Sequence, residues 1–151
     1  MDKTQLLESN FGLWGLIGEL SHSIMLIRQK ELNQYQIPVR QYNILRAIQS
    51  LGPNATVAQV AKQVQRQEHV VSRQTVSLEN EGLIKRTKST RKSTLLTLKV
   101  TNKGLRLIEI ARHSNSIYAI FSSLSSEDCQ KMESILHHLL TEVKNYNHDS
   151  H

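Results

Sequence analysis

The chain has 151 residues, of which 38% are hydrophobic and 21% charged, values typical of one globular domain and not of a disordered segment. No run approaches the roughly 18 apolar residues of a membrane span, and the N-terminal sequence lacks a signal-peptide pattern, so no membrane association is expected. Cys129 is the only cysteine, which excludes an internal disulfide and a four-cysteine zinc site. We therefore expect a cytoplasmic protein.

The net charge of +6 is unevenly distributed along the chain. Residues 39–104 contain twelve basic and three acidic side chains, a net charge of +9, so the remainder carries −3. Positive charge concentrated on one segment is typical of proteins that contact nucleic-acid phosphates. A basic segment that binds membranes would contain more large apolar and aromatic residues than this one does.

Residues 4–34 are predicted to form one long helix. Apolar side chains recur in it at a spacing of about 3.5 residues, as in the seam of a coiled coil: Leu6, Leu13, Ile17, Leu20, Ile24 and Ile27. A second apolar flank and three glycines accompany this seam, and the glycines indicate either close packing against another helix or a bend. A helix that is apolar on more than one face needs more packing partners than one small module provides.

The next segment is predicted to begin with a helix over residues 39–50 and a turn over residues 51–54. The helix buries one face, formed by Val39, Tyr42, Leu45 and Ile48. A second helix follows over residues 56–64, where Thr56 and Gln59 have the spacing of a capping box. Its apolar stripe consists of Val57, Val60, Ala61 and Val64.

A third helix is predicted over residues 68–81, and Gly82 after it suits a C-terminal cap that requires a positive φ. Its buried face consists of Val71, Thr75 and Leu78. Two short amphipathic helices joined by a few residues are typical of a helix-turn-helix, whose second helix enters the DNA major groove. The candidate DNA-contacting residues of this recognition helix and its entry are Gln67, His69, Ser72, Arg73, Val76 and Ser77. Only Arg73 among them can form a bidentate pair with guanine, and a phosphate contact is its alternative role.

Residues 83–100 are predicted to form a β-hairpin, because Leu96, Leu98 and Val100 alternate with polar residues. The residues between its two apolar ends are rich in basic side chains and contain no acid. A basic hairpin directly after a recognition helix is typical of the wing of a winged helix-turn-helix. Its candidate DNA-contacting residues are Lys88, Arg91 and Lys92. A solvated surface hairpin is the alternative interpretation.

Two further helices are predicted near the C-terminus. One follows the cap Thr101 and covers residues 105–123, and the other covers residues 125–146, with Ser125 and Asp128 as a capping box. The last helix repeats the apolar seam at a spacing of about 3.5 residues: Met132, Leu136, Leu139, Val143 and Tyr146. The final five residues, NHDSH, are expected to fray.

Together these elements predict a mostly α-helical fold with a small β-hairpin wing. Residues 37–104 form the winged helix-turn-helix DNA-binding region, and residues 1–36 and 105–147 supply dimerisation helices that flank it. Packing the first and last helices of two copies together produces a two-fold homodimer that presents two recognition helices. Such a dimer binds half-sites about 34 Å apart, so its double-stranded DNA target is a pseudopalindromic operator.

Four stretches resemble the MarR family of bacterial transcription regulators: TVAQVAKQV, VVSRQTVSLENEGLIKR, VTNKG and LSSEDCQKMESILHHLL. The resemblance implies an obligate dimer that binds palindromic DNA, usually represses nearby genes and is often released by phenolic or other small ligands. By analogy, Tyr42, His22 and Arg46 would line the effector cleft.

The sequence departs from the family pattern in two regions, the wing tip and the recognition helix. The family wing usually carries Asp-x-Arg, whereas the tip here reads KSTRKST, which leaves Arg91 as the nearest candidate for the minor groove. Gln74 and Thr75 stand where the family often has aliphatic residues.

Other chemistry receives little support from the sequence. His137 and His138 are adjacent in a helix and point about 100° apart, so they chelate a metal only if His113 or His22 joins them, and we expect no metal site. Cys129 lies where a helix terminus can activate a thiol, but a small structural thiol is the favoured interpretation. No nucleophile–base motif, glycine-rich phosphate loop or carboxylate pair is visible, so neither an enzyme nor a cofactor is expected.

The leading hypothesis is therefore a dimeric DNA-binding regulator that represses nearby genes. One alternative is a winged-helix module whose basic face binds an acidic protein. Another is a ligand or metal sensor without DNA binding, because the wing lacks the family Asp.

Overall fold

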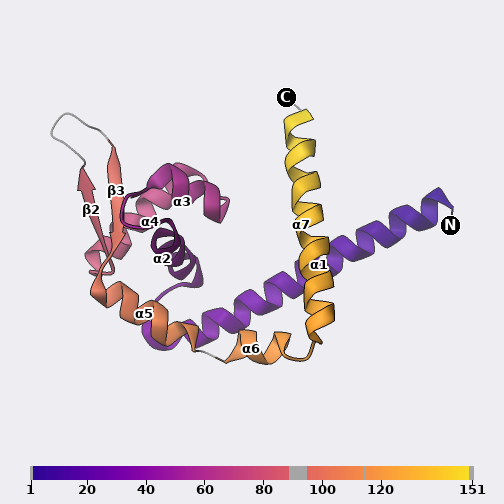
Figure 1. Ribbon diagram of the computed structural model, residues 1–151, viewed down its shortest axis with the longest axis horizontal. Coiled ribbons are helices and arrows are strands. Elements are labelled where there is room, and N and C mark those ends of the chain that lie inside the picture. The colour runs from indigo at the N-terminus through magenta and orange to yellow at the C-terminus, as the bar shows by residue number, and fades with distance from the viewer. Residues whose placement is uncertain (1, 89–94, 114, 150–151) are drawn as a thin grey trace. The chain divides into compact units, whose positions relative to one another are not determined.

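The computed structural model describes residues 2–88, 95–113 and 115–149, which form two compact units, Met1–Ser114 and Asn115–His151. The first unit contains α1 (Lys3–Leu32), the 3-10 turn η1 (Asn33–Tyr35), α2 (Val39–Leu51), β1 (Ala55–Thr56), α3 (Val57–Val64), α4 (Glu68–Asn80), β2 (Ile84–Lys88), β3 (Leu96–Val100) and α5 (Asn102–Arg112). The second unit contains α6 (Ser116–Phe121) and α7 (Ser126–Asp149). The predicted fold class, mostly helical with a small β-hairpin, is therefore confirmed (Figure 1).

Helix α2 lies at the centre of the first unit, where it contacts α3, α4, α5 and β3. The four side chains that the sequence assigned to its inner face are all buried: Val39, Tyr42, Leu45 and Ile48. They pack with fully buried residues of the surrounding elements: Val60, Val71, Leu78, Leu98 and Ile108. Burying each of the larger of these side chains contributes about 1.5–3 kcal/mol, so this cluster fixes how α3 and α4 lie against α2.

The sheet has three antiparallel strands in the order β1-β3-β2. β2 and β3 form the predicted hairpin, with register pairs that run from Ile84↔Val100 to Lys88↔Leu96. The two-residue strand β1 was not predicted, and it pairs Ala55 with Leu98 and Thr56 with Thr97. The base of the wing is thus joined by backbone pairing to the two residues that directly precede α3.

Both predicted caps of the helix-turn-helix are present. The Thr56 hydroxyl oxygen accepts the Gln59 N–H at 3.2 Å, and the Gln59 side-chain oxygen accepts the Thr56 N–H at 3.0 Å, which completes a capping box at the start of α3. Gly82 follows α4 with φ of +71°, and the next N–H, that of Leu83, donates to Leu78 O at 2.9 Å. This bonding closes the end of α4 and directs the chain into β2.

The C-terminal helices differ from the prediction in two ways. The single helix expected over residues 105–123 is wrong, because α5 runs from Asn102 to Arg112 and α6 begins at Ser116. Asn115 and Ser116 stand at this break, and their short polar side chains compete for backbone hydrogen bonds and weaken a helix interior. The expected fraying from residue 147 is also wrong for the described residues, since α7 continues to Asp149, as a helix this long extends by a residue at little cost.

Much of α1 is solvent-exposed within its unit, and its N-terminal part projects away from α2–α5 in Figure 1. The exposed large apolar side chains of α1 are Leu6, Leu7, Phe11, Leu13, Trp14, Leu16, Ile17, Leu20, Leu26 and Ile27. In the second unit, α7 likewise exposes Ile135, Leu136, Leu139, Leu140 and Val143. None of the helices in the described ranges is both long and apolar enough to cross a membrane.

Candidate nucleic-acid interface

Helix α4 has one buried face and one exposed face. Val71, Thr75 and Leu78 have no exposed surface, whereas His69, Arg73 and Val76 are exposed and Ser72 is half-buried. Because successive helical residues are about 100° apart, the exposed group lies on the side opposite the core. The helix is therefore held along one face while the other is presented to solvent.

The buried hydroxyl of Thr75, at a position where the MarR family often has an aliphatic residue, has a hydrogen-bond partner. It donates to the carbonyl oxygen of Ser72 at 2.7 Å, one turn earlier in the same helix. The hydrogen-bonding requirement of this buried hydroxyl is therefore met within α4 itself. Thr75 therefore leaves the inner face of α4 fully buried.

The other two predicted contact residues of α4 and its N-cap, Gln67 and Ser77, differ in their exposure and hydrogen bonding. Gln67 is the exposed N-cap of α4, and its side chain makes no capping hydrogen bond to the helix. Ser77 is half-buried: its hydroxyl oxygen accepts from the Gln41 side-chain amide at 3.2 Å, and the hydroxyl lies 3.2 Å from Glu81 Oε1, to which it donates. Ser77 therefore links α4 to α2 in addition to any contact that it makes outside the chain.

The turn between α3 and α4 depends on Gln65, which has a positive φ of 53°. The following N–H, that of Arg66, donates to Ala61 O at 2.9 Å and closes the end of α3. Glycine is the usual residue at such a position, so the sequence carried no signal for this geometry.

The hairpin has exposed basic side chains, but Arg86 is engaged within the protein. Glu79 Oε1 accepts the Arg86 backbone N–H at 2.9 Å, and Glu79 Oε2 lies 3.9 Å from the guanidinium group. Lys88 is exposed at the end of β2, whereas Arg91 and Lys92 lie outside the described residues.

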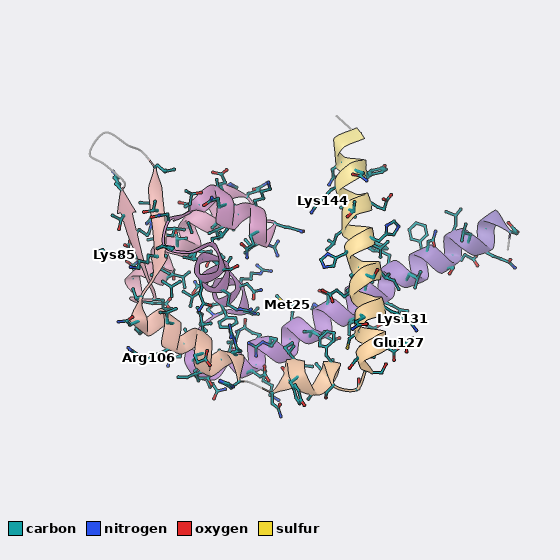
Figure 2. All side chains as sticks on the ribbon, viewed as in Figure 1. Met25, Lys85, Arg106, Glu127, Lys131 and Lys144 are labelled. Carbon is teal, nitrogen blue, oxygen red and sulfur yellow. The ribbon has the colours of Figure 1, made fainter. Side chains whose placement is uncertain are left out.

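Lys85 and Lys99 form a like-charged pair on the hairpin. They are direct cross-strand partners and both are exposed. In Figure 2, Lys85 lies on the side of the hairpin away from the helices. Two cations opposite each other destabilise a sheet unless an anion or solvent separates them. The wing is therefore positively charged on its outer face as well as at Lys88.

A hollow of about 510 Å³ lies between the first turns of α3 and α4 and the start of β3. We call it the wing-side hollow, and it is lined by Thr56, Val57, Ala58, Glu68, His69, Ser72, Leu95 and Leu96. Two of the predicted contact residues, His69 and Ser72, thus share a concave surface with the wing.

A second hollow, of about 410 Å³, lies between α1, α2 and the α3–α4 turn. This α1–α4 hollow is lined by Met25, Arg40, Asn43, Ile44, Val64, Gln65, Arg66, Gln67, Val70 and Gln74. Figure 2 shows Met25 on α1 at the side nearest α2.

The three residues assigned to an effector cleft by analogy do not line the α1–α4 hollow. Tyr42 is buried in the core, where its hydroxyl donates to Ile108 O at 3.4 Å and its ring lies 5.5 Å from the Arg28 guanidinium carbon. His22 and Arg46 are exposed. Tyr42 points into the core because its ring is part of the buried apolar face of α2.

The histidines and the cysteine whose side chains the structure describes are not gathered in a larger cluster. His113 contacts Glu109 at 3.0 Å and His137 lies 3.8 Å from Glu133, each one turn away in the same helix. Across the described ranges, no three His, Cys, Asp or Glu side chains are placed to hold a metal ion. Cys129 is half-buried on α7, in an apolar hollow of about 350 Å³ within the second unit.

Two helices joined by a tight turn, with the second leading directly into an antiparallel hairpin, define a winged helix-turn-helix protein. The family described as HVO_A0114 matches residues 37–99, which is the same part of the chain. No curated protein matches the sequence.

Solved structures match almost the whole chain. The organohalide-sensing transcriptional regulator RdhR-CbdbA1625 is 25% identical with a TM-score of 0.79, over 94% of this chain and 85% of its own. The MarR family transcription regulator SP03579 is 21% identical with a TM-score of 0.79, over 94% and 95%. MepR of Staphylococcus aureus in complex with DNA is 24% identical with a TM-score of 0.76, over 85% and 95%. The chain therefore has the MarR-type winged-helix fold, and the resemblance inferred from its sequence is confirmed.

Proposed function

We propose that this protein is a dimeric, sequence-specific DNA-binding transcriptional regulator that represses nearby genes from a pseudopalindromic operator. The observation that carries the proposal is α4, whose inner face is fully buried while His69, Arg73 and Val76 remain exposed on the other. A helix held in this way can enter the major groove without disturbing the core. The net charge of +9 over residues 39–104 supplies the attraction to phosphates.

Helices at both ends of the chain support the dimer. α1 and α7 expose apolar side chains at coiled-coil spacing, and such surfaces are typical of protein–protein contacts. In this proposal residues 1–36 and 105–147 supply the dimerisation helices, with the exposed apolar side chains of α1 and α7 forming the interface, and residues 37–104 form the DNA-binding region. A two-fold dimer then presents two copies of α4 to the two halves of the operator. MepR, which has the same fold, has been solved in complex with DNA, and this supports DNA as the partner.

The α1–α4 hollow supports release by a small-molecule effector. Its lining includes Gln67, Val70 and Gln74, which belong to α4 or its entry, and Met25, which belongs to α1. A ligand bound there would contact both the recognition helix α4 and the dimerisation helix α1. It would therefore favour one position of α4 relative to α1. RdhR-CbdbA1625 has been solved with 2,4-dichlorophenol bound, which supports a ligand-responsive role for this fold.

A mobility-shift titration with the DNA upstream of the protein's own gene tests the proposal. We expect one discrete shifted species at nanomolar protein, protection of a two-fold symmetric site, and weaker binding to a scrambled duplex of equal length. Equal affinity for both duplexes would show that the basic surface does not read sequence. Absence of binding to either would favour a module that binds an acidic protein.

A further inference from the structure

The basic segment contains three acidic residues, and two of them have partners within the protein. Glu79 accepts the Arg86 N–H at 2.9 Å, and Glu81 Oε1 lies 3.2 Å from the Ser77 hydroxyl. Glu68 is exposed, and its carboxylate has no hydrogen-bond or ion-pair partner among the described residues. Glu68 thus places a negative charge, unpaired within the described ranges, in the segment that is proposed to bind negatively charged DNA.

Glu68 stands at a position from which bases can be read. It is the first residue of α4, and N-terminal residues of a recognition helix are those that contact base edges. Glu68 lines the wing-side hollow together with His69 and Ser72. Glu68 is therefore part of the same concave surface as two predicted DNA-contacting residues.

The chemistry of a carboxylate limits what Glu68 can accept from DNA. In the free protein, water can donate to its oxygens, but a duplex docked on α4 displaces that water. An ionised carboxylate only accepts hydrogen bonds, and phosphates offer it neither a donor nor a favourable charge. In the major groove, the exocyclic amino groups of cytosine and adenine are the donors. Adenine places the acceptor N7 beside its amino group, whereas cytosine presents its amino group without a neighbouring acceptor on the same base.

We propose that Glu68 is a specificity-determining residue, which accepts a hydrogen bond from the N4 amino group of a cytosine in each operator half-site. At sites without that cytosine the carboxylate stays without a donor beside the phosphates, so it also opposes non-specific binding. The inference rests on the proposed function. A different role for Glu68 would be to stabilise the positively charged N-terminus of α4, as acidic residues in a first turn do.

The test is selection of bound sequences from randomised duplexes by the wild type, Glu68→Gln, Glu68→Ala and, as control, Glu109→Gln. Glu109 is exposed on α5, so its replacement removes the same charge away from the wing-side hollow. We expect the wild type to select cytosine at one position per half-site and Glu68→Ala to lose that preference. Glu68→Gln should select adenine there, because glutamine pairs with the N6 and N7 atoms of adenine.

Affinity for a scrambled duplex at fixed low salt provides the second measurement. Removing one carboxylate at about 4 Å from a phosphate should raise this affinity about fivefold for both Glu68 variants. Glu109→Gln should match the wild type in both measurements. Both Glu68 variants lose the interaction with the helix terminus equally, so a purely helix-stabilising role predicts the same base preference in all four proteins.

Unchanged base preference in both Glu68 variants would overturn the inference, whether or not their non-specific affinity rose. A wild type that selects no sequence at all would instead refute the proposed function. The two failures are thus distinguishable in one experiment.

Discussion

Arg73 is the side chain on the exposed face of α4 that can make two parallel hydrogen bonds to guanine. Arg73→Ala should leave the fold intact because the side chain lies outside the core. It should weaken binding to the operator by about 1–3 kcal/mol and binding to a scrambled duplex by less. Fluorescence anisotropy on both duplexes at one salt concentration measures the difference.

Arg112→Ala is the matched control for Arg73, because Arg112 is exposed at the end of α5. It should bind both duplexes as the wild type does. Equal losses on operator and scrambled DNA for Arg73→Ala would make Arg73 a phosphate contact.

At the scale of the element, the junction between β3 and α5 depends on Gly104. A Cβ atom on this residue would collide with the Leu83 carbonyl oxygen and a Val100 methyl group. The same carbonyl accepts the Thr101 N–H at 3.0 Å, so it cannot move without breaking that bond. Gly104→Ala should therefore lower the free energy of unfolding by about 1–3 kcal/mol in urea titrations.

Asn102→Ala supplies the comparison for Gly104, since Asn102 is exposed in the first turn of the same helix. Its effect should stay within about 0.5 kcal/mol. A Gly104→Ala protein as stable as Asn102→Ala would mean that α5 docks less closely than the structure indicates.

The wing should add affinity without adding sequence preference. Replacing Lys88, Arg91 and Lys92 singly by alanine should weaken binding to every duplex and flatten the slope of log K against log salt by about 1 for each lost phosphate contact. Lys144→Ala, on α7, should leave the slope unchanged. A changed operator preference with an unchanged slope would assign the wing to base reading instead.

Elements whose formation depends on residues close together in the sequence were predicted well. The apolar stripes of α2, α3 and α4 and the capping box of α3 depend on residues three or four positions apart, and the structure places the buried faces as expected. The exposed face of α4 followed from the same periodicity.

Features that depend on distant partners or on unusual backbone geometry were missed. β1 is two residues long and pairs with a strand some forty positions later, so no local pattern marks it. Gln65 adopts a positive φ without being glycine. The wing-side hollow, and with it the position of Glu68, depends on three elements coming together. Sequence periodicity gives the face of a helix but not its neighbours.

At the scale of the whole molecule, the exposed apolar surface predicts the assembly. Ile17 is 47% exposed on α1, so Ile17→Glu leaves the buried core of the first unit unchanged. The wild type should sediment at twice the 17.3 kDa chain mass at micromolar concentration, and the variant should dissociate or bind its partner more weakly. A wild type that sediments as a single chain would contradict the dimer.

Removal of the residues after Ser123 tests the same surface from the other end of the chain. The truncated protein loses α7 and with it the apolar side chains from Ile135 to Val143. We expect it to aggregate or unfold, because α1 then lacks its proposed partner.

Thr56 has two roles: it pairs with Thr97 in the sheet and caps the first turn of α3. Separation of β1 from β3 therefore frees the residue whose side chain protects the Gln59 N–H. The wing base and the first helix of the helix-turn-helix should open as one cooperative unit. In native-state hydrogen exchange, the Gln59 and Leu98 amides would then become labelled with the same opening free energy and the same dependence on denaturant.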